Sequence, residues 1–107
     1  MFSRIISCTI NPAKVNEFRT ALNHQFLPRI QSQPGFIENI ESLDPATGQF
    51  SCLTLWKTAS DVENYDKGLF QQVAEALGPL MQEGPTVKTL PVENSSAHHI
   101  KAGKVAA

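Results

Sequence analysis

Several residue types that define whole classes of protein are scarce in this sequence. Only two cysteines are present, Cys8 and Cys52, which is too few for a disulfide-stabilised scaffold. The sequence has no run of about 18 apolar residues, the length that spans a bilayer. Its start, Met1 to Ser7, lacks the apolar stretch of about 7–15 residues that a signal peptide contains. We therefore predict a cytoplasmic protein with no membrane partner.

An excess of charge of one sign is also missing. Nine Lys and Arg residues stand against ten Asp and Glu residues, for a formal net charge of −1. Proteins that bind the phosphates of nucleic acids usually carry a clear basic excess. The balance therefore predicts no nucleic-acid partner.

Metal-ligand spacings are absent as well. Cys8 and Cys52 are far apart in the sequence and form no CxxC pair. His98 and His99 are neighbours, so they would project to opposite sides of an extended chain and make a poor chelate. We predict no metal site.

The sequence does contain enough apolar side chains for one core. Hydrophobic residues make up 41% of the 107 residues, a length that suits one domain and is too short for two cores. These residues recur with regular spacing, and the spacing predicts the elements of the fold.

The first half of the chain predicts a strand, a helix and a hairpin. Residues 4–10 carry β-branched side chains with partial alternation, and Asn11-Pro12 is typical of a helix start. Pro28 should kink the last turns of this helix. Its apolar side chains recur every three or four residues, at Val15, Phe18, Leu22, Phe26 and Ile30.

A hairpin and a second helix follow. Residues 36–57 read as two strands joined by a turn, and Ser60 with Glu63 matches the capping box of a helix start. This helix carries an apolar stripe, with possible breaks at Gly68 and Gly78. Residues 86–92 predict a fourth strand.

The order β-α-β-β-α-β predicts an α+β, ferredoxin-like fold. With right-handed crossovers it forms a four-stranded antiparallel sheet with both helices on one face. We assign residues 1–92 to this domain and residues 93–107 to a C-terminal tail or arm.

The uncovered face of such a sheet should be polar in a monomer, and here both faces carry apolar residues. Phe50, Cys52 and Trp56 point one way in their strand, and Leu53 and Leu55 point the other way. Contiguous apolar patches are uncommon on monomers. We predict a homodimer through the sheets; the alternative is that these side chains are exposed singly.

Two short motifs border the predicted hairpin: Gln33-Pro34-Gly35-Phe36-Ile37 at the start of the second strand, and Leu55-Trp56-Lys57-Thr58 at the end of the third. Together they resemble the antibiotic biosynthesis monooxygenase (ABM) family of the dimeric α+β barrel superfamily. The resemblance covers roughly residues 4–92. It implies a cofactor-independent monooxygenase that oxidises a small aromatic compound with O2, in a pocket between sheet and helices.

Three positions differ from the family pattern. Tyr65 stands where typical members have a helix histidine, and Leu69 stands where a second histidine often precedes a phenylalanine. Cys52 replaces the asparagine of the quinone-forming enzymes. The haem-degrading relatives need a histidine in this second helix, which contains none, so we predict neither haem nor any other cofactor.

The candidate catalytic residues are Trp56 and Tyr65, as hydrogen-bond donors to an aromatic substrate. The alternatives are a core tryptophan whose N–H meets a protein acceptor and a tyrosine at the rim of the helix. Candidate substrate-binding residues are Trp56, Cys52, His24, Phe18, Leu22 and Leu69. Cys52 could instead be a small buried hydrophobe, and His24 a solvated helix residue.

Three functions remain open at this point. The first is ABM-type oxidation of a phenol-like or quinol-like compound. The second is a non-catalytic small-molecule-binding or stress-responsive homodimer of the same fold. The third is a structural dimer whose own side chains fill the pocket.

Overall fold

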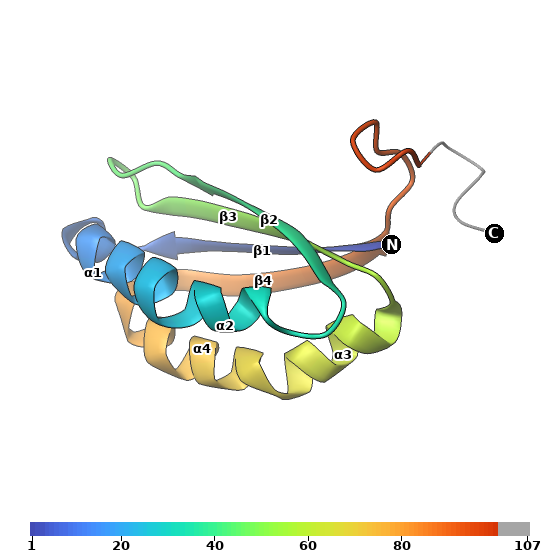
Figure 1. The fold of residues 1–107 in the computed structure, drawn as a ribbon. Helices are drawn as coiled ribbons and strands as arrows, with labels where there is room; N and C mark the ends of the chain where they lie inside the picture. Colours follow the sequence, from blue (N-terminus) through green and yellow to red (C-terminus); the bar gives the residue numbers. More distant parts are fainter. Residues whose placement is uncertain (101–107) are drawn as a thin grey trace.

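The computed structural model describes residues 1–100 and has two layers, a sheet and a helical layer. The sheet contains β1 (Phe2–Ile10), β2 (Phe36–Leu43), β3 (Gln49–Trp56) and β4 (Met81–Pro91). The strand order is β2-β3-β1-β4, and each of the three neighbouring pairs is antiparallel. All the helices lie on one side of this sheet (Figure 1). The predicted α+β, ferredoxin-like fold is therefore confirmed.

The first helical region is more segmented than the even spacing of its apolar residues predicts. It consists of η1 (Pro12–Lys14), α1 (Val15–Thr20), a π-helical turn η2 (Ala21–Phe26) and α2 (Leu27–Gln31). Asn11 Oδ1 accepts a hydrogen bond from the Ala13 N–H at 3.0 Å, as a capping residue does. Pro28 lies in the first turn of α2, where its missing N–H costs little, and the wide π-helical turn precedes it.

The second helical region contains α3 (Ala59–Lys67), α4 (Leu69–Leu77) and η3 (Gly78–Leu80), with Gly68 between the two α-helices. Its predicted capping residue, Ser60, is wrong by two positions. Thr58 caps the helix: its Oγ1 accepts from the Asp61 N–H at 3.1 Å and donates to Asp61 Oδ2 at 2.8 Å. Both residue pairs fit the capping pattern, and the earlier pair prevails because β3 ends at Trp56.

The fourth strand begins earlier than predicted, at Met81 instead of Thr86. A β-bulge lies opposite Ser7 to Thr9, so pairing with β1 continues on both sides of Gly84. Gly84 has a φ of +91°, and a Cβ there would meet the Ser7 carbonyl oxygen at 3.0 Å. Gly84 is typical of a turn, so the sequence pattern did not indicate that residues 81–85 belong to the strand.

A second glycine, Gly35, allows a close contact between the sheet and the helical layer at the start of β2. Its φ is +82°, and an added Cβ would collide with the side chain of Asp61 at the start of α3. Its carbonyl accepts a hydrogen bond from the Lys57 N–H at 2.9 Å. The turn before β2 therefore packs directly against the cap of α3.

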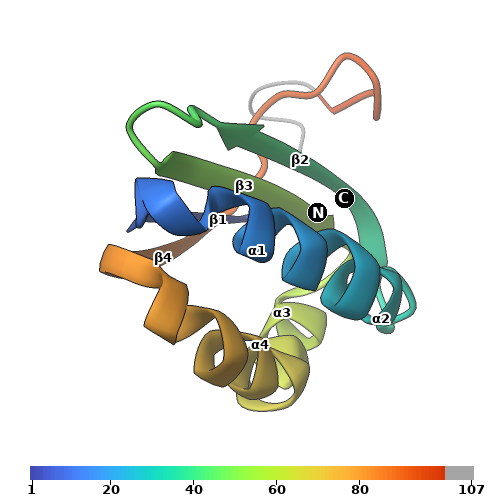
Figure 2. The same ribbon diagram turned by 90° about the vertical axis from the view of Figure 1, so that its left-hand side faces the viewer.

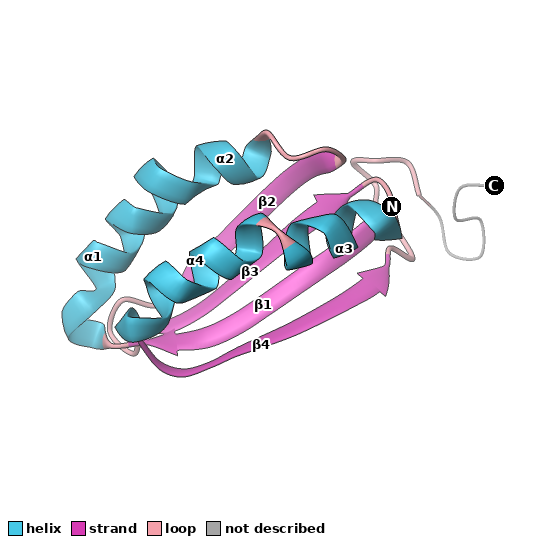
Figure 3. Cartoon of the chain, turned by 90° about the horizontal axis from the view of Figure 1, so that it is seen from below, coloured by secondary structure: helices cyan, strands magenta, loops and turns pink. Residues whose placement is uncertain are grey.

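The core lies between the helices and one face of the sheet, which we call the inner face. Figures 2 and 3 show the two helical regions side by side across it, with β4 along an edge that they leave uncovered. Trp56, Phe18 and Ile10 are the largest fully buried side chains. The Phe18 and Phe50 rings meet edge to face at 4.8 Å.

The opposite face, the outer face, is apolar at one end only. Ile5, Leu53 and Leu55 face outward there, while Ile40 and Leu90 are 53% and 47% exposed. The segment 92–100, which we call the arm, rises on this side of the sheet (Figure 1).

The arm is tied to the sheet at two places. The Val92 N–H donates to the Met1 carbonyl at 3.0 Å, and His98 Nε2 lies 3.1 Å from Glu38 Oε1. Glu38 is paired with Leu55, which is buried. Residues 101–107 of the predicted tail lie outside the described residues.

Candidate functional site

A cavity of about 50 Å³ lies between the inner face and the helices. One wall is apolar and comes mainly from helices. The sheet wall contains the polar groups. The lining side chains are Phe18, Leu22, Leu27, Ile30, Tyr65, Phe70, Val73 and Leu77 from the helices, and Arg4, Ile6, Asn39, Glu41, Phe50, Cys52 and Thr54 from the sheet.

Arg4 is the cation of this cavity, and only 3% of it is exposed. Its Nε–H donates to Asp66 Oδ1 at 2.7 Å, and Asp66 is partly exposed. The guanidinium carbon lies 4.1 Å from the centre of the Phe70 ring and 5.0 Å from that of Tyr65. Its Nη2 atom is buried and has no hydrogen-bond partner among residues 1–100.

Glu41 is the carboxylate of the cavity. Its Oε2 accepts a hydrogen bond from Asn39 Nδ2 at 3.3 Å. Burial raises the pKa of this carboxyl above its usual range, because removal from water penalises the charged form. Besides Arg4, the inner face of the sheet thus carries a carboxyl group whose neutral form is favoured by burial.

The cysteines are thiols in this environment. The pKa of Cys52 is raised to about 12, mainly by burial and in part by the Glu41 carboxylate, while the Arg4 guanidinium acts in the opposite direction. Burial also raises the pKa of Cys8 to about 11. A thiol in this state is a poor nucleophile at neutral pH, which agrees with the small-hydrophobe alternative for Cys52.

Tyr65 brings a hydroxyl to the helical side of the cavity. Burial raises its pKa to about 12, with Arg4 acting in the opposite direction, so the phenol keeps its proton at neutral pH. Its hydroxyl forms no hydrogen bond within the described part of the chain. The geometry leaves Tyr65 able to donate to a ligand, and its catalytic role stays a prediction.

Trp56 lies behind Tyr65 and is not one of the lining residues. It is fully buried, stacks on the Tyr65 ring at 5.0 Å and meets Phe36 edge to face at 5.7 Å. Its indole N–H donates to Thr54 Oγ1 at 2.8 Å. In this arrangement the N–H is already used inside the protein, so the predicted donor role has no support from the geometry.

The other predicted binding residues divide between the cavity and elsewhere. Phe18, Leu22 and Cys52 line the cavity. Leu69 is buried in the core without lining it, and His24 is exposed on η2. Their roles in binding stay predictions.

Sequence reasoning missed the polar residues of the sheet wall, namely Arg4, Asn39 and Glu41. The signal was available for Arg4, because it shares the strand face of Ile6, Cys8 and Ile10. A charged residue in the phase of a buried strand face is uncommon and indicates a partner or a function.

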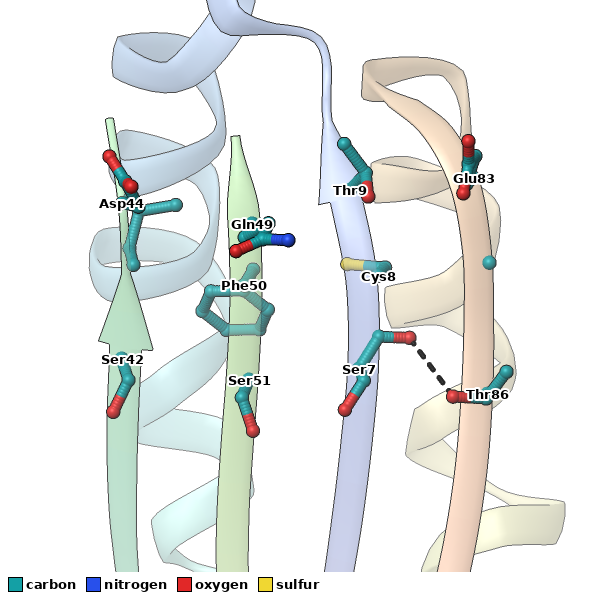
Figure 4. Close-up of a pocket in the computed structure, with 12 residues that line it drawn as sticks. Ser7, Cys8, Thr9, Ser42, Asp44, Gln49, Phe50, Ser51, Glu83 and Thr86 are labelled. Atoms are coloured by element: carbon teal, nitrogen blue, oxygen red, sulfur yellow. Dashed lines mark hydrogen bonds between the residues drawn. The ribbon is translucent and has the colours of Figure 1, made fainter. Parts of the chain in front are cut away.

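A second hollow, of about 690 Å³, lies on the outer face at the end of the sheet formed by the β2–β3 turn, the end of β1 and the start of β4. Figure 4 shows hydroxyl, amide and carboxylate groups along its walls. These come from Ser7, Thr9, Ser42, Asp44, Gln49, Ser51, Glu83 and Thr86. This hollow is the polar end of the outer face.

Residues 1–100 contain neither a cluster of metal ligands nor a membrane-spanning helix. No group of three or more His, Cys, Asp or Glu residues in this range could hold a metal ion. None of the helices in the same range is both long enough and apolar enough to span a membrane.

Solved structures share this architecture over most of their length. A proposed antibiotic biosynthesis monooxygenase of Caulobacter crescentus CB15 has a TM-score of 0.74 and 18% identity, over 87% of this chain and 90% of that one. Another, from Deinococcus radiodurans, has a TM-score of 0.74 and 14% identity, over 89% of this chain and 95% of that one. The ActVA-Orf6 monooxygenase of Streptomyces coelicolor, in complex with nanaomycin D, has a TM-score of 0.73 and 14% identity, over 88% of each chain.

This chain has the fold of the antibiotic biosynthesis monooxygenases. No protein-family model and no curated protein matches the sequence. Identities this low establish the fold alone, because one fold serves many activities. The expected fold is thus confirmed, and the activity belongs to the proposal below.

Proposed function

We propose that this protein is an ABM-type monooxygenase that oxidises a small phenol-like or quinol-like compound with O2, without flavin, haem or metal. The observation that carries the proposal is the cavity between sheet and helices. Its walls are mostly apolar, and its polar groups are few and convergent, as in small-molecule sites. The nanaomycin D bound to a protein of the same fold supports a planar aromatic ligand.

The chemistry needs no outside electron donor. A phenol that loses its proton carries negative charge on a ring carbon, and this carbon forms a bond to O2. The peroxide anion so formed takes back a proton and becomes a hydroperoxide. Its O–O bond breaks as the same ring carbon loses its hydrogen, so water leaves, one oxygen atom stays as a carbonyl and the substrate supplies all the electrons. The part of the protein is to exclude water and to place polar groups at the developing charge.

A ligand would have to widen the cavity. Its volume of about 50 Å³ is well below the roughly 300 Å³ of a typical ligand site. Among the described residues, one side-chain hydrogen bond joins the two helical regions that cover it: the exposed bond from Arg29 Nη2 of α2 to Gln72 Oε1 of α4 at 3.0 Å. A backbone bond from the Asn11 N–H to the Leu80 carbonyl at 2.9 Å joins the start of the first region to the end of the second. We therefore place the entrance between α2 and α4, next to the π-helical turn.

The second part of the proposal is a homodimer through the outer faces. Ile40 and Leu90 are half exposed in the single chain and lie on the same face of the sheet. Covering the exposed half of each side chain contributes about 1 kcal/mol. A second copy supplies a matching apolar surface under two-fold symmetry.

The test is oxygen transfer to 1-naphthol by protein without added flavin, nicotinamide or metal. The expected products are 1,4-naphthoquinone and water, with one ¹⁸O atom from ¹⁸O2 in each quinone by mass spectrometry. Binding is followed separately through the fluorescence of Trp56, the single tryptophan, which stacks on the cavity residue Tyr65. Heat-unfolded protein corrects for spontaneous oxidation.

The outcomes separate the proposed enzyme from its alternative. Quenching without quinone formation would contradict turnover and favour a non-catalytic binding module, which the replacement of the family's histidines and asparagine by Tyr65, Leu69 and Cys52 also favours. No quenching by any planar phenol would contradict both and leave a structural dimer. Equal quinone formation in Tyr65→Phe would remove Tyr65 from the mechanism.

A further inference from the structure

One buried polar atom of a cavity residue has no hydrogen-bond partner within the described part of the chain. Arg4 Nη2 is a hydrogen-bond donor with no partner among the described residues, on a side chain that is 3% exposed. Buried polar groups in proteins nearly always have a partner, and a charged donor costs more than a neutral one when it has none. A ligand atom in the adjoining cavity would satisfy it.

The rest of the Arg4 side chain is held in place. Asp66 accepts from Nε at 2.7 Å, and the rings of Phe70 and Tyr65 contact the guanidinium at 4.1 and 5.0 Å. The group is therefore fixed by one ion pair and two rings before any ligand arrives. The guanidinium is thus positioned in advance, and the reorganisation that binding requires is the widening of the cavity beside it.

We propose that the cavity takes acidic phenols as their phenolates, with the phenolate oxygen on Arg4 Nη2 and the phenol proton on Glu41. This inference rests on the proposed function, since it assumes that the cavity is the aromatic site, and it names the substrate class of that site. Arg4 binds the substrate and Glu41 is its proton acceptor.

The balance of charge explains why both residues are needed. A phenolate entering beside an ionised Glu41 would put two negative charges in a small, mostly apolar cavity, which is strongly unfavourable. Transfer of the proton from the phenol O–H to Glu41 leaves one anion facing Arg4 and a neutral carboxylic acid. The net charge of the cavity and ligand does not change.

The surroundings of Glu41 support this transfer. Burial already favours its neutral form, and its one hydrogen-bond partner among residues 1–100, Asn39, is uncharged. The other titratable groups that line the cavity are Arg4 on β1, Cys52 on β3 and Tyr65 on α3. The side chains that line it from α1, η2, α2 and α4 are apolar.

The first experiment uses 4-nitrophenol, whose phenolate absorbs visible light and whose neutral form does not. It is compared with 4-nitroanisole, the methyl ether, which cannot ionise, and both are titrated without oxygen. At a pH where free 4-nitrophenol is neutral, wild-type protein should generate the phenolate band. It should also bind 4-nitrophenol at least about tenfold more tightly than the ether, as expected for a charged hydrogen bond.

Two variants with the same change in net charge locate the effect. Arg4→Met should remove the visible band and the preference for the phenol, with binding of the ether changed less than about twofold. Arg19→Met removes an exposed arginine on α1 and should behave as wild type. Circular dichroism checks the fold; if Arg4→Met does not fold, the wild-type band and preference decide alone.

The role of Glu41 is tested by the dependence of binding on pH. Below the ionisation of the free phenol, wild-type affinity should be nearly independent of pH, because the proton moves to Glu41 and not to solvent. In Glu41→Gln the proton must leave to solvent, so affinity should rise about tenfold for each pH unit.

Three results would overturn the inference. Equal binding of phenol and ether with no visible band would refute the phenolate but leave the aromatic site of the proposed function standing. An unchanged band in Arg4→Met would refute Arg4 as the anion site. Binding of neither compound would refute the inference and the aromatic site together.

Discussion

The two faces of the sheet are built from the same strands but differ in burial and polarity. On the inner face, the helices enclose Trp56 and Phe18 completely, and they bury Arg4, whose ion-pair partner Asp66 stays partly exposed. On the outer face, Ile40 and Leu90 stay half exposed beside a polar hollow. Alternation along each strand assigns neighbouring residues to opposite faces. A single strand therefore carries the candidate chemistry and the candidate interface together.

The difference locates where substitutions should act. The inner face is complete within one chain, so changes there should alter stability and ligand binding. The outer face leaves Ile40 and Leu90 half exposed in one chain, so changes at its apolar end should alter the proposed dimer.

The largest effect is expected from Trp56→Ala on the inner face. It removes a fully buried ring that contacts Tyr65 and Phe36, and should lower the free energy of unfolding by about 3–5 kcal/mol. Urea unfolding followed by circular dichroism measures this loss. Trp56→Phe keeps a ring and should lose clearly less. An equal loss in both variants would show that the hydrogen bond to Thr54, and not the packing, dominates.

On the outer face, Ile40→Glu should dissociate the proposed dimer with little effect on the fold of each chain. A carboxylate buried without a partner at an interface costs several kcal/mol. Light scattering should change from about twice the chain mass of 11.7 kDa to that mass. The matched control is Ser42→Glu, two residues away on the same face but at the polar hollow. A wild-type monomer at micromolar concentration would contradict the dimer.

The titratable groups of the inner face predict a loss of stability in alkali. Cys52 and Tyr65 have pKa values raised to about 12, from about 9 and 10, and Cys8 to about 11. Their contributions are fully present below the unfolded pKa values and are lost as pH rises toward the folded values. Urea midpoints should therefore fall above about pH 9. The fall should be shallower in Cys52→Ala, and a steady midpoint up to pH 11 would contradict the burial of these groups.

The smallest effect concerns the entrance to the cavity. Gln72→Ala removes the exposed hydrogen bond to Arg29 and should change stability by less than about 0.5 kcal/mol. It should nevertheless speed the association of 1-naphthol in stopped-flow fluorescence. Gln25→Ala removes an exposed amide from η2 and serves as the control. Unchanged association in Gln72→Ala would place the entrance elsewhere.

The fold could be predicted because its elements follow local patterns. Alternation defined the strands, and the stripe from Val15 to Ile30 defined the first helical region. The errors fell where two local signals competed or where a backbone feature left no pattern. Thr58 and Ser60 both fit a cap, and the bulge at Gly84 concealed the first half of β4.

The site was harder to predict, because a hydrogen bond within the fold cannot be read from spacing. Nothing in the sequence indicates that Thr54 occupies the indole N–H of Trp56, or that Tyr65 stands between that ring and the cavity. The phase of Arg4 in its strand was visible. Only the packing of β1 against α3 and α4 reveals that its Nη2 atom has no hydrogen-bond partner among residues 1–100.

The tight turn at Gly35 changes the meaning of the motif that first indicated the family. Because a side chain at this position would strike Asp61, the Pro34-Gly35-Phe36 tripeptide is a steric requirement of the joint between β2 and α3. Its Phe36 contacts Trp56, and neither of these two rings lines the cavity. The tripeptide therefore works as a signature of architecture. Searches for proteins that share this chemistry should instead compare the residues aligned with Arg4 and Glu41.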